Sequence, residues 1–155
     1  MKFNCFILLI FSTFTVLFFR CNVDDICLSN QHAVQTCFFS METKNKLAQP
    51  RTTIFGLEKD NDSIYRNENV LNMFLPLSFD RDTTSFLIKI QTKSDTIHFV
   101  HTKKLNFISR ECGFTFDFVL DTVFYTNIFI DSVAIIYPHV KYNENLENVE
   151  IYIYN

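Results

Sequence analysis

Apolar and polar residues alternate with a period of two along several stretches of this chain, and this alternation restricts its fold more than any other feature. In residues 114–121 the large apolar side chains occupy every second position: Phe114, Phe116, Phe118 and Leu120. Successive side chains of a strand point to opposite faces, so the pattern is typical of a half-buried strand. We therefore expect the three phenylalanines to be buried together on one face.

Shorter stretches repeat this pattern, and no window of comparable length has helical spacing. Strands are expected near residues 34–42, 51–58, 62–66, 70–75, 86–90, 97–99, 114–121, 127–137 and 151–154. The chain has only two Gly and three Pro residues, so its turns must use Asn, Asp and Ser, as in Lys93-Ser94-Asp95. The pattern predicts an all-β fold, an antiparallel β-sandwich of immunoglobulin-like or jelly-roll Greek key type.

The N-terminal segment has the features of an export signal. Lys2 precedes an apolar run over residues 6–19, which is shorter than the roughly 20 residues of a membrane-spanning helix. We expect a signal peptide over residues 1–20, a tether over 21–32 and a β-sandwich domain over 33–155. Simple secretion and retention as an uncleaved anchor are the alternatives.

The residues around Cys21 resemble the end of a bacterial lipoprotein signal, where a cysteine thiol is acylated before cleavage. Arg20 departs from that pattern, because a small residue usually precedes the cysteine. Asn22-Val23-Asp24-Asp25 resembles the acidic tetrapeptide of surface lipoproteins in Bacteroidetes, although a solvated linker gives the same composition. The resemblance implies lipid attachment at Cys21 and an exported protein, lipid-anchored in the outer membrane or periplasm.

The charge of the expected mature chain argues against a nucleic-acid partner. The sequence has 14 basic and 17 acidic residues, and residues 1–20 contain Lys2 and Arg20 but no acid. The mature chain therefore has a formal charge of −5, without a basic run. The nearest approach to a basic patch is His101, Lys103 and Lys104, which we interpret as a solvated strand end.

Residues 107–114, Phe-Ile-Ser-Arg-Glu-Cys-Gly-Phe, carry a family resemblance over most of the mature chain. Together with Asp24-Asp25-Ile26-Cys27, Leu75-Pro76-Leu77 and Asp95-Thr96-Ile97, they resemble a family of uncharacterised exported Bacteroidetes proteins. The resemblance implies a small envelope β domain, usually with a lipoprotein signal, and no assigned activity or catalytic residue. Arg20 and Cys37 depart from the family pattern.

Three cysteines remain once Cys5 leaves with the signal and Cys21 is acylated, and they allow three pairings. An exported compartment favours a disulfide. We predict a bond between Cys27 and Cys112, because it would fasten the start of the chain to the strongest strand, and Cys112 belongs to the most family-specific run. Cys37 is then a small buried apolar residue. A bond from Cys37 to Cys112 and a fully reduced set are the alternatives.

The sequence supports neither a catalytic residue nor a metal or cofactor site. Arg110 beside Cys112 could lower the thiol pKa, but no histidine can be placed next to it. His98 and His101 are three residues apart, which puts them on opposite faces of a strand. We expect these two, with the isolated His32 and His139, to be surface or strand-edge residues.

The expected function is that of a non-catalytic cell-envelope lipoprotein module. It would contact a membrane through its lipid and would bind an envelope protein or glycan or serve a structural role. Tyr142, Tyr152 and Tyr154 are the candidate aromatic residues for a glycan surface. The alternative is a small periplasmic or surface enzyme that uses Cys112 or the carboxylates of Glu111 and Asp117.

Overall fold

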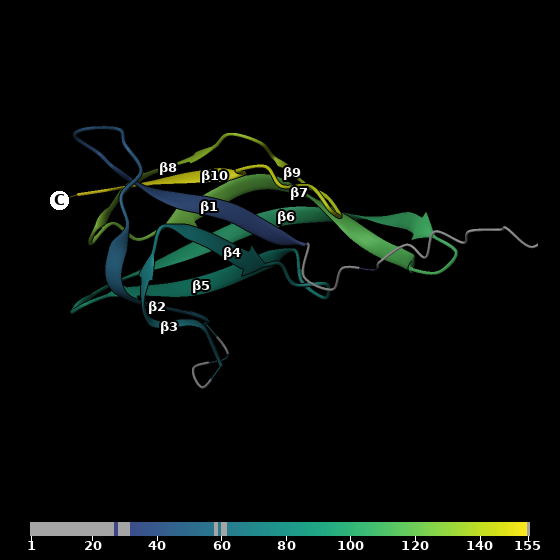
Figure 1. Ribbon diagram of the computed structural model, residues 1–155, viewed down its shortest axis with the longest axis horizontal. Helices are drawn as coiled ribbons and strands as arrows, with labels where there is room; N and C mark the ends of the chain where they lie inside the picture. The colour runs from purple at the N-terminus through teal and green to yellow at the C-terminus, as the bar shows by residue number, and fades with distance from the viewer. Residues whose placement is uncertain (1–26, 28–31, 58, 60–61, 155) are drawn as a thin grey trace, which may run out of the picture.

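Two β-sheets pack face to face in the computed structural model, which describes residues 27, 32–57, 59 and 62–154 (Figure 1). The four-stranded sheet has the order β4 (Asn72–Pro76), β1 (Ala33–Ser40), β10 (Val149–Ile153) and β8 (Ile130–Ile135). The six-stranded sheet has the order β3 (Ser63–Val70), β2 (Gln49–Gly56), β5 (Thr83–Ile90), β6 (Lys93–Ser109), β7 (Gly113–Tyr125) and β9 (His139–Val140). The predicted all-β sandwich is confirmed. This part of the chain contains no helix long and apolar enough to cross a bilayer.

Nearly all neighbouring strands are antiparallel, as predicted, and the exception joins the two ends of the domain. β1 and β10 run parallel, in a register from Thr36 opposite Val149 to Ser40 opposite Ile153. Parallel strands cannot be joined by a short turn. All the other strands of the domain therefore lie in the connection between these two.

The core lies between the sheets and contains the apolar side chains of their inner faces. On β1, Val34 and Phe38 point inward, and Ile97, Phe99 and Phe118 do so from the facing sheet. These side chains are completely buried. Burying a large apolar side chain contributes roughly 1.5–3 kcal/mol to stability, so this layer is the main source of stability.

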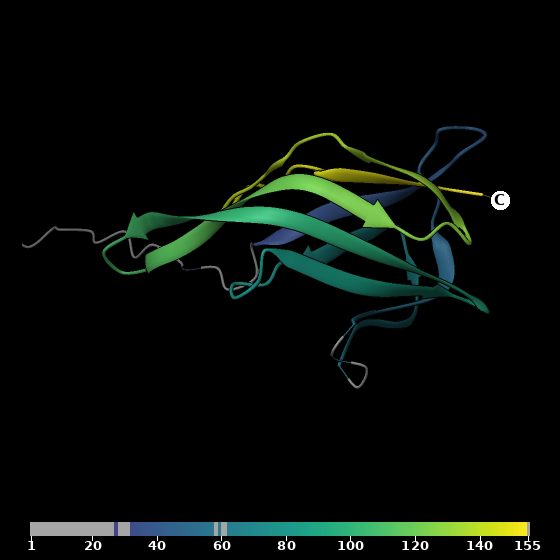
Figure 2. The same ribbon diagram turned by 180° about the vertical axis from the view of Figure 1, so that it is seen from behind.

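The β6–β7 hairpin continues beyond the rest of the sandwich as a two-stranded ribbon (Figures 1 and 2). β6 pairs with β5 only from Lys93 to Val100, and its later residues pair with β7 alone. β9 pairs with β7 only at Phe118 and Val119. We call residues 105–116 the overhang. A two-stranded ribbon is at best marginally stable by itself, so this segment needs another source of support.

The predicted burial of Phe114 is wrong. Phe118 is completely buried and Phe116 is half-buried, but 67% of Phe114 is exposed. Phe114 and Phe118 do share a face, because they are four positions apart and every second side chain of a strand points to the same face. The other sheet does not extend over the overhang, so the inner face of the hairpin is uncovered at Phe114.

The turn predicted at Lys93-Ser94-Asp95 lies two residues earlier. Ile90 pairs with Lys93, which leaves Gln91 and Thr92 as the turn, and Gln91 adopts a φ of 56°. Asp95 is a buried residue of β6, and its carboxylate accepts hydrogen bonds from the backbone N–H groups of residues 128–130 and from the Thr126 hydroxyl. It therefore fixes the connection between β7 and β8.

Candidate functional site

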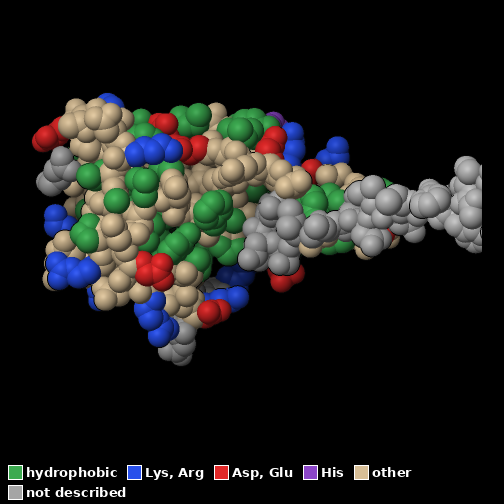
Figure 3. Space-filling model, in the orientation of Figure 1, with side chains coloured by type: hydrophobic (Ala, Val, Ile, Leu, Met, Phe, Trp, Pro, Cys, Tyr) green, Lys and Arg blue, Asp and Glu red, His purple; other side chains and the backbone are tan. Residues whose placement is uncertain are grey.

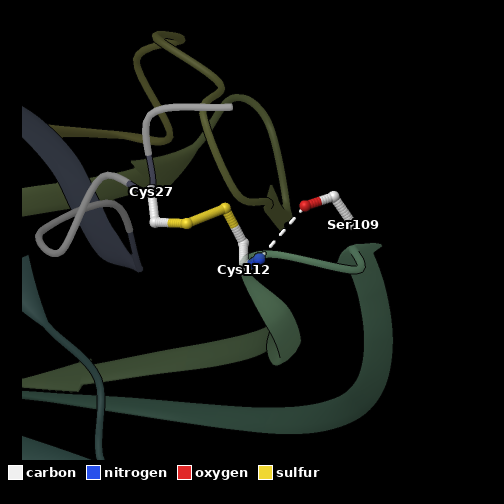
Figure 4. Close-up of a disulfide and its surroundings, with 3 residues drawn as sticks. All are labelled: Cys27, Ser109 and Cys112. Carbon is white, nitrogen blue, oxygen red and sulfur yellow. Dashed lines mark hydrogen bonds between the residues drawn. A yellow bond between two sulfur atoms is a disulfide. The ribbon is translucent and has the colours of Figure 1, made fainter. Parts of the chain in front are cut away.

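The predicted disulfide between Cys27 and Cys112 is present, with 5.5 Å between the two Cα atoms (Figure 4). Cys112 ends the turn between β6 and β7, where its backbone N–H donates a hydrogen bond to Ser109 Oγ over 3.1 Å. The next residue, Gly113, has a φ of 72°, a left-handed conformation that glycine adopts without strain. The bond therefore joins the segment before β1 to the tip of the overhang.

The same bond leaves Cys112 without the free thiol that the alternative enzyme would use as its nucleophile. A disulfide sulfur cannot act as a thiolate nucleophile. Of the two nearby carboxylates, Glu111 is exposed, and Asp117 accepts hydrogen bonds from Asn106 Nδ2 at 2.9 Å and from the Tyr142 backbone N–H at 3.3 Å. Asp117 thus has a structural role, holding the chain after β9 against the ribbon.

A small pocket of about 260 Å³ lies beside the disulfide. Its wall is mostly aromatic or apolar, formed by Cys27, His32, Phe79, Ile108, Cys112, Phe114, Thr115 and Tyr142. His32 Nε2 is 2.7 Å from Thr115 Oγ1, and its ring packs 5.8 Å from that of Tyr142. Burial lowers the pKa of His32 below its usual value, although the Asp117 carboxylate opposes the shift. His32 is therefore a neutral packing residue at pH 7.

A larger groove of about 620 Å³ lies between the β2–β3 connection and residues 76–81. Its described lining carries charges of both signs, from Lys59, Asp62, Asp80 and Arg81, beside the apolar Leu57 and Phe79. Its volume is in the range of small-molecule pockets. It contains none of the catalytic, metal or aromatic candidates from the sequence.

The prediction that His101 lies at a solvated strand end is wrong. Only 1% of the residue is exposed, its ring meets Phe118 edge-on at 5.1 Å, and Nε2 is 2.8 Å from Thr84 Oγ1. Burial lowers its pKa. His101 continues the inward-facing series of Ile97 and Phe99, so the alternation puts it in the core.

The other histidines are dispersed. His98 lies on the opposite face of β6 and contacts Ser85 Oγ at 2.7 Å, while His139 is exposed. The described ranges hold no group of three or more His, Cys, Asp or Glu residues suited to binding a metal ion.

Cys37 is buried, as predicted, but it lies outside the core in a polar cluster. Its Sγ is within hydrogen-bond distance of Asn72 Oδ1 (2.9 Å), Glu147 Oε2 (3.3 Å) and Lys46 Nζ (3.4 Å). Lys46 and Glu147 also form a salt bridge. Burial raises the pKa of the Cys37 thiol, and Glu147 raises it further, so the thiol is protonated at neutral pH. The sequence carries no signal for this cluster, because the Cys37–Glu147 contact spans 110 positions.

The three candidate tyrosines do not form one aromatic surface. Tyr142 is half-buried against His32, next to the start of β1. Tyr152 packs on Phe39, near the end of β1, with Lys44 Nζ 4.4 Å above its ring. These positions lie about 20 Å apart along the strand. The visible face in Figure 3 shows acidic and basic side chains interspersed.

Cys21, the predicted lipid site, lies outside the described residues. A family model described as a family of unknown function, DUF6452, matches residues 51–153. The match covers more than half of the chain, so the protein belongs to this family. No curated protein and no solved structure matches the chain.

Proposed function

We propose that this DUF6452 protein is a non-catalytic module of the cell envelope, exported by its N-terminal signal and held to a membrane by a lipid on Cys21. Its folded domain would serve as a structural or binding unit. The proposal includes the narrower family assignment, that of exported lipoprotein-like proteins of Bacteroidetes. A disulfide-bonded domain fits an exported protein, since disulfides are rare in the reducing cytosol.

The observation that carries the proposal is the disulfide between Cys27 and the tip of the overhang. Without this bond, the N-terminal segment would join the domain at Ala33, where β1 begins. With it, the first covalent connection to the sheet is at Cys27, six residues after Cys21. A bond at that place is well suited to a chain whose N-terminus is fixed to a membrane.

The roles of the reactive side chains also favour a non-catalytic module over the enzyme alternative. Cys112 is consumed in the disulfide, and Asp117 holds Asn106 and Tyr142. The remaining described thiol, Cys37, is buried and protonated. Each of these groups has a packing or hydrogen-bonding role that explains its presence.

Intact-mass analysis of the membrane fraction tests the proposal. The full chain, expressed in a host that processes lipoproteins, should lose residues 1–20 and gain the mass of a lipid on Cys21. Cys21→Ser should abolish the added mass and release the protein from the membrane. Cys5→Ser is the matched control, because it removes the cysteine inside the signal segment. It should leave the added mass and the membrane attachment unchanged. An unmodified mass, or membrane attachment that survives Cys21→Ser, would contradict the proposal.

A further inference from the structure

We propose that the overhang touches the lipid bilayer, with its apolar face immersed in the headgroup region. The proposal rests on the proposed function, because it places the bilayer at the lipid on Cys21. It goes beyond attachment in naming which surface of the folded domain meets the membrane.

The overhang presents a continuous apolar face to solvent. Leu105, Phe107 and Phe114 are 57%, 53% and 67% exposed. Phe107 pairs with Phe114 across the ribbon, and their ring centroids are 5.1 Å apart. Leu105 lies two residues before Phe107, so all three side chains share one face. Exposed apolar faces of this kind mark interaction surfaces.

The disulfide determines how far this face can be from the proposed lipid. Cys112 is two residues from Phe114, and it is bonded to Cys27. Six residue steps separate Cys21 from Cys27, and a fully extended chain covers about 20 Å in six steps. The far end of β7, at Phe124, lies about another 30 Å along the strand. A lipid on Cys21 therefore keeps the overhang, and not the opposite end of the domain, next to the bilayer.

The size of the apolar face favours a bilayer over a second copy of the chain. A large apolar side chain offers about 200 Å², so the three exposed fractions together give on the order of 350 Å². A stable protein interface buries about 800 Å² on each partner. Insertion into a headgroup region needs no complementary partner, and amphipathic surfaces enter it to a depth of about 5–10 Å.

The charges near the face predict which lipids matter. Lys103 is exposed and lies on the same face, two residues before Leu105. Arg110 and Glu111 lie in the turn at the tip, and Lys104 pairs with Asp117 on the opposite face. With both signs present, attraction to anionic lipid is weak, so the contact depends on apolar burial. Binding of the overhang should therefore be similar on zwitterionic and anionic vesicles.

Single-tryptophan reporters test the proposal directly, because the natural sequence contains no Trp. Phe114→Trp places the reporter on the overhang, and Phe124→Trp is the matched control. Phe124 lies on the same strand and is 60% exposed, close to the exposure of Phe114. Both full-length, acylated variants are reconstituted into phosphatidylcholine vesicles with and without brominated acyl chains. Intact mass is measured on the same samples.

The expected result is a blue-shifted emission from the Phe114→Trp variant that brominated lipid reduces at least about twofold, with the emission of the Phe124→Trp variant unchanged. Adding Cys27→Ser and Cys112→Ser to the Phe114→Trp variant should weaken the quenching, because the tether then joins the domain at Ala33. Replacing part of the phosphatidylcholine with phosphatidylglycerol should leave the quenching unchanged.

Several outcomes would overturn the proposal. Equal, weak quenching of both reporters in an acylated protein would overturn the bilayer contact and leave the proposed function standing. An unmodified mass would overturn both. A blue shift of the Phe114→Trp variant that grows with protein concentration in the absence of vesicles would show that a second copy covers the overhang instead.

Discussion

The two halves of the β6–β7 hairpin have the same alternating pattern and opposite environments. Within the sandwich, Ile97, Phe99 and Phe118 are completely buried beneath the four-stranded sheet. In the overhang, Leu105, Phe107 and Phe114 continue the same face and are more than half exposed. The alternation of a strand therefore determines the face on which a side chain lies. The extent of the four-stranded sheet determines whether that face is buried.

The two ends of the same hairpin are also held by different chemistry. Hydrogen bonds to the Asp95 carboxylate hold the end at which β7 continues toward β8. The tip is held by the Cys27–Cys112 bond. A buried carboxylate needs several donors, which the backbone N–H groups of residues 128–130 supply. The tip has no second layer to bury such a group, and a covalent bond works equally well in water.

Replacing a phenylalanine in each half tests the contrast in burial and gives the largest expected effect. Phe118→Ala should lower the free energy of unfolding by about 3–5 kcal/mol, because it leaves a cavity in the core. Phe114→Ala should lower it by less than about 1 kcal/mol, since that ring packs mainly on Phe107. Urea denaturation of both variants measures the difference. Equal losses would mean that the overhang is covered in solution.

Removing the disulfide tests whether the tip depends on it. Cys27→Ser combined with Cys112→Ser should lower the free energy of unfolding by about 2–4 kcal/mol, because the bond closes a loop with a sequence separation of 85. Amide hydrogen exchange should accelerate in the overhang far more than in β5. The native protein under reducing conditions should behave like the double variant. Unchanged exchange in the overhang would show that the ribbon is stable without the bond.

The Asp95 end can be weakened by pH or by mutation, with a smaller effect. Burial acts to raise the pKa of Asp95, but the hydrogen bonds from Thr126 and from the backbone of residues 128–130 outweigh it and lower the pKa below its usual 3.8. A lowered folded-state pKa stabilises the fold above the unfolded pKa, and this stability is lost as the pH falls through the folded value. We expect a loss as the pH drops below about 4.

Asp95→Asn provides the matching variant. It should cost about 2 kcal/mol at pH 7, because the amide replaces one acceptor oxygen with a donor that faces other donors. The difference from the native protein should narrow as the pH drops below about 4, the pKa of an unfolded carboxyl group, and toward the lower folded-state pKa of Asp95. Urea denaturation of both proteins, from acidic to neutral pH, measures this difference in the free energy of unfolding. A difference that stays constant over this range would contradict the role of the carboxylate.

Much of the fold is predictable because a strand is a local pattern. Each of the nine expected strands overlaps a strand of the structure, and β9, a strand of two residues, is too short to give a pattern. The Cys27–Cys112 pairing is the preferred one of three, because the compartment favours a disulfide and Cys112 belongs to the run that carries the family resemblance. Residue type is a poorer guide for two polar residues of β6. His101 is expected in solvent and Asp95 in a turn, and both are buried.

The sequence by itself determined the strands, their faces and the sandwich class, because these depend on residue spacing, and it favoured the Cys27–Cys112 bond among three possible pairings. Only the tertiary structure decided the parallel pairing of β1 with β10, the cluster around Cys37 and the exposure of Phe114. Each of these depends on contacts between residues far apart in the chain. Residue spacing carries no information about where the four-stranded sheet ends. The edge of that sheet separates the buried half of the hairpin from the overhang.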